Sequence, residues 1–164
     1  MTTWSPQEHE VAESITRALR TVGVEQGDLV LMHSDASAVI KMLGSGDWGR
    51  ALELLGTACL DAVGPDGTVV VPTFNWAFCK GQPYDARRTP SVLGLFSNYL
   101  RTRPDAVRSP HPIFSFAAIG PHAPSLFSGI SKSSFGEDSV FGRLRQRDVQ
   151  TLKERHLVEG VPSS

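Results

Sequence analysis

Two amphipathic helical patterns alternate with two short, continuously apolar runs in the first half of the sequence. Apolar residues at helical spacing follow a capping box at Ser5–Glu8 and predict a helix over 6–22. The run over 28–33 has the pattern of a strand that is buried on both faces. A second helix is expected over 47–63 and a second strand over 68–72. This order favours an α/β fold, a layered sheet with flanking helices.

The rest of the chain is less regular. The segment 34–46 has the small residues and glycines of a loop or a short helix. An aromatic-rich irregular stretch follows the second strand. A third helix is expected from Thr89 to Leu100, and a third strand over 113–119. The segment 121–136 is expected to be mostly loop, and 137–147 a short helix.

Composition excludes several classes of protein. The 164 residues suffice for one domain, and hydrophobic residues make up 40% of them. The net charge of −1 gives no global field that would attract nucleic acid or an anionic membrane. We see no signal peptide and no apolar run of membrane-spanning length. We therefore expect a cytoplasmic protein without nucleic-acid or membrane partners.

The two cysteines, Cys59 and Cys79, do not form a disulfide framework. Neither has a CxxC partner, and no pair of histidines has HExxH spacing. We expect reduced thiols and no metal site.

Two histidines stand where apolar strands end or begin. His33 ends the first strand, and ligands gather at strand ends in open α/β sheets. His111 lies between Pro110 and Pro112, which restrict the backbone and hold the imidazole at low entropic cost. Each histidine also has a purely structural interpretation, as a group that bonds nearby backbone atoms. Both interpretations are open at this point.

Five stretches occur in a recognisable order: LVLMHSDAS, GTVVVPTFNW, TPSVLGLFSNYLR, RSPHPIFSFAAIGPHA and SFGEDSVFGRL. Together they run from about Leu29 to Leu144 and resemble the aminoglycoside 3-N-acetyltransferase family, also called the antibiotic N-acetyltransferase family. The resemblance implies the α/β/α arrangement of that family. It also implies acetyl-CoA as the donor, an amine of an aminoglycoside or other aminosugar as the acceptor, and a link to antibiotic resistance.

The resemblance also implies which residues line the acyl-transfer cleft. The residues expected to border CoA are His33, Ser34, Asp35, Ser37, Thr73, Phe74, Ser109, His111 and Ser115. No catalytic residue is assigned, and His111 is the candidate base if that base lies in this part of the family pattern. We expect His33, Thr73 and His111 to lie around one cleft, because each adjoins an apolar strand.

The sequence departs from the family pattern after Leu144. Members of the family continue with an apolar strand and with a helix that supplies the general base, whereas residues 148–153 are polar here. We therefore predict an incomplete N-terminal part of the family domain over 1–147 and a polar tail over 148–164. The tail should pack poorly, leaving an open sheet edge through which the protein could self-associate.

Two functions are consistent with the sequence. The first is acetyl-CoA-dependent N-acetyl transfer to an aminosugar, weak or absent in this short chain because the base region is missing. The second is a non-catalytic fragment that acts as a binding module. The segment TFNWAFCKGQPYD also resembles family members that acylate sugar amines in surface-polysaccharide pathways, so the acceptor is left open.

Overall fold

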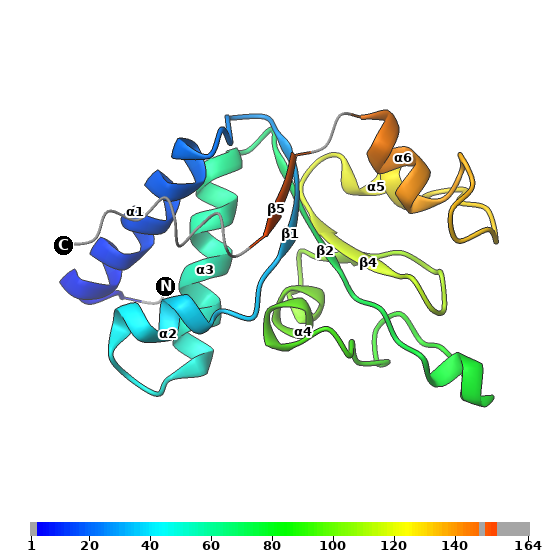
Figure 1. Cartoon of the computed structure of the whole chain (residues 1–164), viewed down its shortest axis with the longest axis horizontal. Helices are drawn as coiled ribbons and strands as arrows, with labels where there is room; N and C mark the ends of the chain where they lie inside the picture. Colours follow the sequence, from blue (N-terminus) through cyan, green and yellow to red (C-terminus); the bar gives the residue numbers. More distant parts are fainter. Residues whose placement is uncertain (1–2, 148–149, 154–164) are drawn as a thin grey trace.

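The computed structural model describes residues 3–147 and 150–153. Its elements in chain order are α1 (Pro6–Thr21), β1 (Leu29–His33), α2 (Ser37–Leu43), α3 (Trp48–Val63), β2 (Thr68–Pro72), the short 3-10 helix η1 (Ala77–Lys80), α4 (Leu95–Thr102), β3 (Val107–Arg108), β4 (Phe116–Ile119), α5 (Ala123–Phe127), α6 (Val140–Gln146) and β5 (Gln150–Lys153). The strands form one mixed sheet in the order β3-β4-β2-β1-β5 (Figure 1). Strands β2 and β5 run parallel to β1, whereas β4 runs antiparallel to both β2 and β3.

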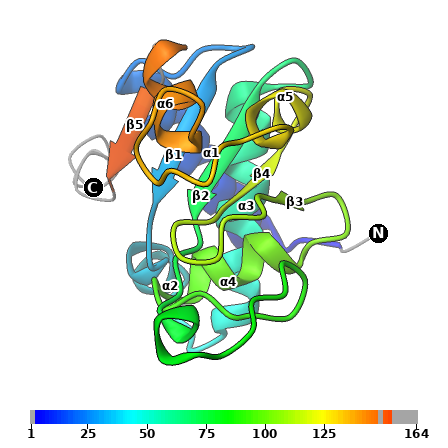
Figure 2. The same cartoon turned by 90° about the vertical axis from the view of Figure 1, so that its right-hand side faces the viewer.

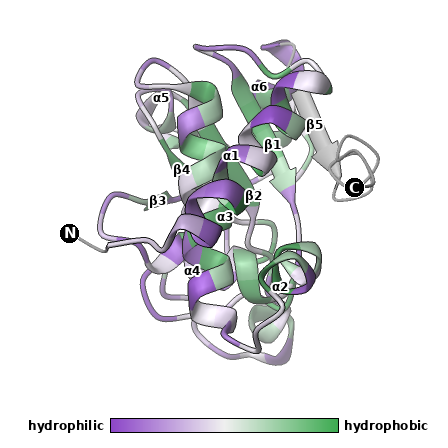
Figure 3. Cartoon of the chain, turned by 90° about the vertical axis from the view of Figure 1, so that its left-hand side faces the viewer, coloured by the Kyte–Doolittle hydropathy of each residue, from purple (hydrophilic) through white to green (hydrophobic). Residues whose placement is uncertain are grey.

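Helices cover both faces of the sheet, as expected for a layered α/β fold. Val69 and Val71 of β2 point into a core shared with α1, α3 and α4, while Val70 points into a second core with α5 and α6. The two helix layers lie on either side of the strands in Figure 1. Figure 3 shows hydrophobic residues along β1, β2 and β4 and hydrophilic residues along the visible side of α1.

The regular elements predicted from apolar periodicity are present. The predicted helices over 6–22 and 47–63 and the strands over 28–33 and 68–72 correspond to α1, α3, β1 and β2. The capping box also forms, because the Ser5 side chain accepts a hydrogen bond from the Glu8 backbone and the Glu8 carboxylate accepts one from the Ser5 backbone. Local signals are strong in these segments, and tertiary packing agrees with them.

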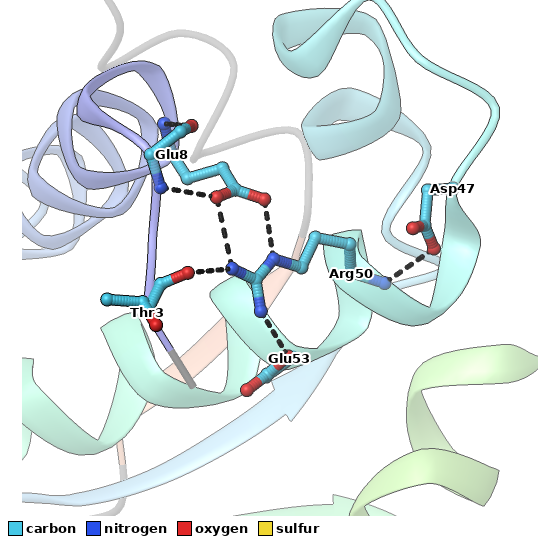
Figure 4. Close-up of polar contacts among 6 residues, drawn as sticks. Thr3, Glu8, Asp47, Arg50 and Glu53 are labelled. Carbon is cyan, nitrogen blue, oxygen red and sulfur yellow. Dashed lines mark hydrogen bonds and ion pairs between the residues drawn. The ribbon is translucent and has the colours of Figure 1, made fainter. Parts of the chain in front are cut away.

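Helix α1 is tied to α3 by Arg50 (Figure 4). The guanidinium donates to Glu8 Oε2 at 3.0 Å and to the Thr3 carbonyl oxygen at 3.1 Å, and it also donates to Glu53 Oε2 at 2.9 Å. The hydrogen bond from Arg50 holds the pKa of the Glu8 carboxyl at about 2, well below its usual range. One arginine therefore joins the first turns of the two helices.

Two predicted boundaries in the middle of the chain were wrong. The helix expected from Thr89 begins at Leu95, because the Asn98 amide bonds both the N–H and the C=O of Ser91 and holds the preceding segment in a turn. The strand expected over 113–119 is regular only from Phe116. The two-residue strand β3 was not anticipated, since so short a segment has no periodicity to read.

A second correction concerns the polar segment after the last helix. Residues 148–153 were not expected to form a buried strand, yet the backbone of β5 pairs in parallel with Val30–His33 of β1. In the described sheet β5 is an edge strand. An edge strand pairs with its neighbour through backbone N–H and C=O groups, and it does not need the apolar side chains that a buried central strand carries on both faces. The rest of the predicted tail lies outside the described residues.

Within the described part of the chain, no helix combines the length and the hydropathy that a membrane crossing needs. Cys59 is buried and Cys79 exposed, and both are free thiols, as expected from the sequence. Burial raises the pKa of the Cys59 thiol to about 12.

Candidate functional site

The carboxyl ends of β1 and β2 meet at one edge of the sheet because these strands are parallel. His33 is the last residue of β1, and Thr73 directly follows β2. Since β4 is antiparallel and Phe116 pairs with Pro72, the turn that carries His111 comes to the same edge. In Figure 2, β1 and β2 run side by side toward the lower half of the view, where the chain after β1 leads into α2. The three elements predicted to share a site therefore end together.

The loop after β1 is shaped by its own side chains. Ser34 is buried, and its Oγ accepts a hydrogen bond from the Ala36 backbone at 3.1 Å. The Asp35 carboxylate accepts one from the Ser37 backbone at 2.8 Å. Ala36 has a φ of 68°, in the left-handed region that non-glycine residues seldom adopt. These bonds turn the chain sharply into α2 and leave His33 and Asp35 exposed at the edge.

Three of the predicted hydroxyl residues lie inside the protein. Thr73, Ser109 and Ser115 have no exposed surface. The hydroxyls of Thr73 and Ser115 are 2.9 Å apart, and Ser115 Oγ also donates to the Thr73 carbonyl oxygen at 2.8 Å. Ser109 Oγ accepts from the Phe116 backbone. These residues hold the wall of the site together, and their contact with CoA stays a prediction.

Arg108 is the residue at this edge that sequence reasoning missed. Its Nε donates to Thr73 Oγ1 at 3.1 Å and to Ser115 Oγ at 3.2 Å, and its Nη2 donates to the Thr73 carbonyl oxygen at 2.9 Å. Nη1 donates to the carbonyl oxygens of Ala86 and Thr89. The only sequence signal was its place at the head of the RSPHP motif.

The environment of Arg108 is largely neutral. Its guanidinium lies over the Tyr84 ring at 5.2 Å from the centroid, and the Tyr84 hydroxyl donates to the Ser109 carbonyl oxygen at 2.9 Å. Burial lowers the pKa of Arg108 from its ordinary value. The side chain thus fixes the loop around Tyr84 onto the ends of β2 and β4.

His111 has the geometry of a turn histidine. Its Nδ1 accepts hydrogen bonds from the backbone N–H groups of Ile113 at 3.2 Å and Phe114 at 3.0 Å. Its Nε2 lies 3.3 Å from Ser134 Oγ in the next loop. An Nδ1 that accepts two N–H groups must be unprotonated, and burial lowers the pKa of the ring. The geometry of His111 therefore supports its structural interpretation, in which the ring bonds nearby backbone atoms and holds the turn.

Six aromatic rings form a network at the same edge, which we call the aromatic patch: Phe74, Trp76, Phe114, Phe116, Phe135 and Phe141. Phe74, a predicted site residue, lies 5.2 Å from Phe114 and 5.4 Å from Phe116 between ring centroids. Trp76 is 42% exposed and Phe135 67%. Sequence reasoning noted the aromatics after β2 but gave no role to Phe135, which comes from a distant loop.

A depression of about 420 Å³ lies at the opposite edge of the sheet, lined by residues that include Gln26, Asp61, Gly67 and Gly120. Gly67 precedes β2 and Gly120 follows β4, so this depression is remote from the loops described above. None of the predicted site residues lines it.

Comparison with known proteins places this architecture among the acetyltransferases. The family model described as aminoglycoside 3-N-acetyltransferase matches residues 31–153. Aminoglycoside N(3)-acetyltransferase IV of Salmonella sp is 36% identical over 137 residues, which cover 82% of this chain and 49% of that protein. This chain spans about half the length of the curated relatives that it matches first.

Solved structures share the fold. AAC-VIa bound to sisomicin superposes with a TM-score of 0.72 at 27% identity and covers 93% of this chain, which in turn covers 59% of AAC-VIa. The binary complex of AAC-IIIb with CoASH has a TM-score of 0.73, covering 87% of this chain and 58% of AAC-IIIb. At 23% identity, this second likeness shows the fold alone.

Proposed function

Because this chain belongs to the aminoglycoside 3-N-acetyltransferase family, we propose that it takes part in acetyl transfer from acetyl-CoA to an amine of an aminosugar. The observation that carries the proposal is the match over 31–153, which includes β1, β2 and β4 and the loops where they meet. Three segments that are distant in sequence end at that edge, which supports the proposal of a site there. The part over 1–147 is proposed to be the unit that holds the donor.

The loops at the ends of β1 and β2 are proposed to border the CoA arm. The loop 33–37 is held in a fixed turn by Ser34 and Asp35, so it offers a rigid wall to an extended ligand. The turn of Thr73 and Phe74 would form the facing wall. Ser109, His111 and Ser115 would act from behind, by fixing the backbone of that wall.

The reaction needs a neutral amine and a stabilised oxyanion. The amine nitrogen attacks the thioester carbonyl carbon, the C–N bond forms, the C–S bond breaks, and CoA leaves as a thiol after taking a proton. A base must remove the ammonium proton, because only the neutral amine is nucleophilic. The lone pair of His111 Nδ1 already accepts two N–H groups, so we assign His111 to positioning and not to proton transfer.

An aminosugar acceptor is supported by the relative AAC-VIa, which was solved with sisomicin bound. A link to antibiotic resistance would follow only if the acceptor is such a drug. We also propose that the protein works in the cytoplasm, where acetyl-CoA is available. Self-association through the edge of β5 is a further proposal.

Calorimetry with CoA and a thiol-release assay test the proposal. Purified protein is expected to bind CoA and, with acetyl-CoA and an amine acceptor, to release free thiol above the rate without acceptor. Binding of CoA without any thiol release would favour the binding module over the transferase. If CoA does not bind at all, the proposed function is wrong.

A further inference from the structure

Exposed apolar side chains gather on and beside the aromatic patch. In the part of the chain that the structure describes, seven large hydrophobic residues are exposed. Two of them, Trp76 and Phe135, are rings of the patch, and a third, Phe78, follows Trp76 in η1. Val92 is also exposed, and its N–H donates to the Phe74 carbonyl oxygen. Four of the seven therefore share one surface, which is typical of an interaction site and not of scattered surface residues.

The exposed part of the patch has two ends. Trp76 lies 5.6 Å from Phe114 and Phe135 lies 5.2 Å from Phe114, between ring centroids, so Phe114 stands between the two exposed rings. Trp76 directly precedes η1, whereas Phe135 belongs to the loop that leads into α6. Figures 1 and 2 place η1 at the lower end of this side of the molecule and the loop before α6 in the upper half.

The two ends carry charges of opposite sign. The segment 77–88 at the η1 end has three basic side chains and one acidic side chain, all exposed: Lys80, Asp85, Arg87 and Arg88. The segment 130–138 at the other end has one basic and two acidic side chains, also exposed: Lys132, Glu137 and Asp138. None of these seven residues takes part in the ion pairs found among the described residues. Their charges are therefore open to a partner.

This arrangement is complementary to itself. In a dimer with a two-fold axis through the middle of the patch, the η1 end of one copy faces the loop before α6 of the other. The exposed rings would then meet at the centre and the unlike charges at the rim, which is the usual anatomy of a protein interface. Unlike charges also fix the register, since a slipped or parallel arrangement would bring like charges together.

We infer that the aromatic patch is the interface of a symmetric homodimer, so that its occupant is a second copy of this chain. Trp76 and Phe135 form its apolar centre, and Lys80 faces Glu137 of the partner subunit. A ligand of one charge sign is disfavoured, because the surroundings of the patch carry both signs. The inference does not rest on the proposed function, and it differs from association through the edge of β5, which would leave the patch uncovered.

Sedimentation velocity of the whole chain over a series of concentrations tests the inference. Trp76→Ala removes an exposed ring from both sides of a symmetric interface at once. We expect it to raise the dissociation constant of the dimer by about tenfold or more. Trp48→Ala is the matched control, because Trp48 is 40% exposed at the start of α3, outside the patch. This control should keep the wild-type dissociation constant.

An exchange of charges tests the register of the two copies. Lys80→Glu brings two carboxylates together across the axis and should weaken the dimer about tenfold at low ionic strength. The double variant Lys80→Glu, Glu137→Lys restores unlike charges and should recover most of that loss. Lys41→Glu makes the same change of net charge on α2, which lies away from η1 in Figure 1, and should leave the dimer intact.

Four results would overturn the inference. The first is a wild-type chain that stays monomeric at about 0.1 mM. The second is a dimer that neither Trp76→Ala nor Lys80→Glu weakens, since its interface would lie elsewhere, as at the edge of β5. The third is a double variant as weak as Lys80→Glu, which would show that the two ends do not meet. The fourth is growth into larger open-ended assemblies, which a closed two-fold contact does not allow.

Calorimetry with CoA on the same proteins keeps this inference apart from the proposed function. A dimer that does not bind CoA would leave the interface standing and contradict the transferase proposal. A monomer that binds CoA would do the reverse. A monomer that loses CoA binding on Trp76→Ala would assign the patch to the donor site in place of a second copy.

Discussion

Arg108 bonds Thr73 twice, through Nε to the side-chain hydroxyl at 3.1 Å and through Nη2 to the carbonyl oxygen at 2.9 Å. Arg108 lies on β3, and β4 stands between β3 and β2 in the sheet, so the guanidinium reaches across a whole strand. The same group bonds the carbonyl oxygens of Ala86 and Thr89. One side chain on a two-residue strand therefore fixes the loop that leads from the candidate site to α4.

Replacing Arg108 by Met should destabilise the protein by about 3 kcal/mol, because it leaves several carbonyl and hydroxyl groups without their charged donor. Urea unfolding measures the change. Arg103→Met is the control, since Arg103 forms a partly exposed ion pair with Asp105 that should contribute about 1 kcal/mol or less. Equal losses in the two variants would contradict the role assigned to Arg108.

His111→Ala should lower stability by about 1–2 kcal/mol, because two backbone N–H groups lose their acceptor. His111→Asn should recover part of the loss, since the amide oxygen of Asn can accept in place of Nδ1. Urea midpoints at neutral pH compare the three proteins. Identical midpoints for the Ala variant and the wild type would show that Nδ1 does not hold this turn.

The pKa of His111 also predicts a pH dependence. Its folded pKa lies below the ordinary value of 6.5, so the unfolded chain binds the proton more readily. The stability from this group is therefore fully present above pH 6.5 and is lost as the pH falls through 6.5 towards the folded pKa. NMR titration of the His111 ring should give a midpoint below 6.5, and a midpoint above it would contradict the burial effect.

Glu8 predicts a second, more acidic dependence. Its folded pKa of about 2 lies below the ordinary 4.5, so its contribution is complete above pH 4.5 and is lost as the pH falls through about 2. The decline in thermal midpoint below pH 4.5 should be smaller in Glu8→Gln than in the wild type. Glu10→Gln, an exposed neighbour on α1, should keep the wild-type decline. If the thermal midpoints of Glu8→Gln and Glu10→Gln declined equally with falling pH, the contact between Glu8 and Arg50 would not be the cause of the decline.

Gly120→Ala should be strongly destabilising. A Cβ at Gly120 would lie 2.3 Å from the Gly67 carbonyl oxygen, and the residue has a φ of +133°. We expect a loss of about 3 kcal/mol or more, measured by thermal unfolding. Gly129→Ala is the control for backbone strain, since Gly129 has a φ of +59° but no atom within 4 Å of its Cβ position. Gly129→Ala should lower the free energy of unfolding by only about 1 kcal/mol.

Elements with a strong local signal could be read from the sequence, and elements fixed by distant contacts could not. The capping box and apolar spacing of α1 are local, as is the apolar run of β2. The late start of α4 depends on Asn98, whose bonds to Ser91 bridge seven residues. Strand β5 pairs through its backbone, so its polar side chains gave no indication of a strand.

The residues of the candidate site also fall into two groups, those with a local sequence signal and those fixed by contacts with distant segments. Strand ends were predictable from the apolar runs, so the structure has His33 at the end of β1 and Thr73 after the end of the parallel strand β2, as expected. That His33, Thr73 and His111 lie around one cleft stays a prediction. The hydrogen bonds that Thr73 and Ser115 accept inside the protein were not predictable, because their donor Arg108 comes from another strand. Phe135 carried no signal of its own. Its role became visible only once the fold placed it 5.2 Å from Phe114.

The packing of the aromatic patch has a spectroscopic consequence. Trp76 is held 5.6 Å from Phe114 at an interplanar angle of 80°, and Phe74 is nearly perpendicular to Phe114 at 87°. Rings fixed in such an asymmetric arrangement give near-ultraviolet circular dichroism, which disappears when side-chain packing is lost. Other ordered rings, such as the stacked pair Phe96 and Tyr99, contribute as well, so the part of the signal that is lost on replacing Trp76 by Ala would report on the aromatic patch without any label attached to the protein.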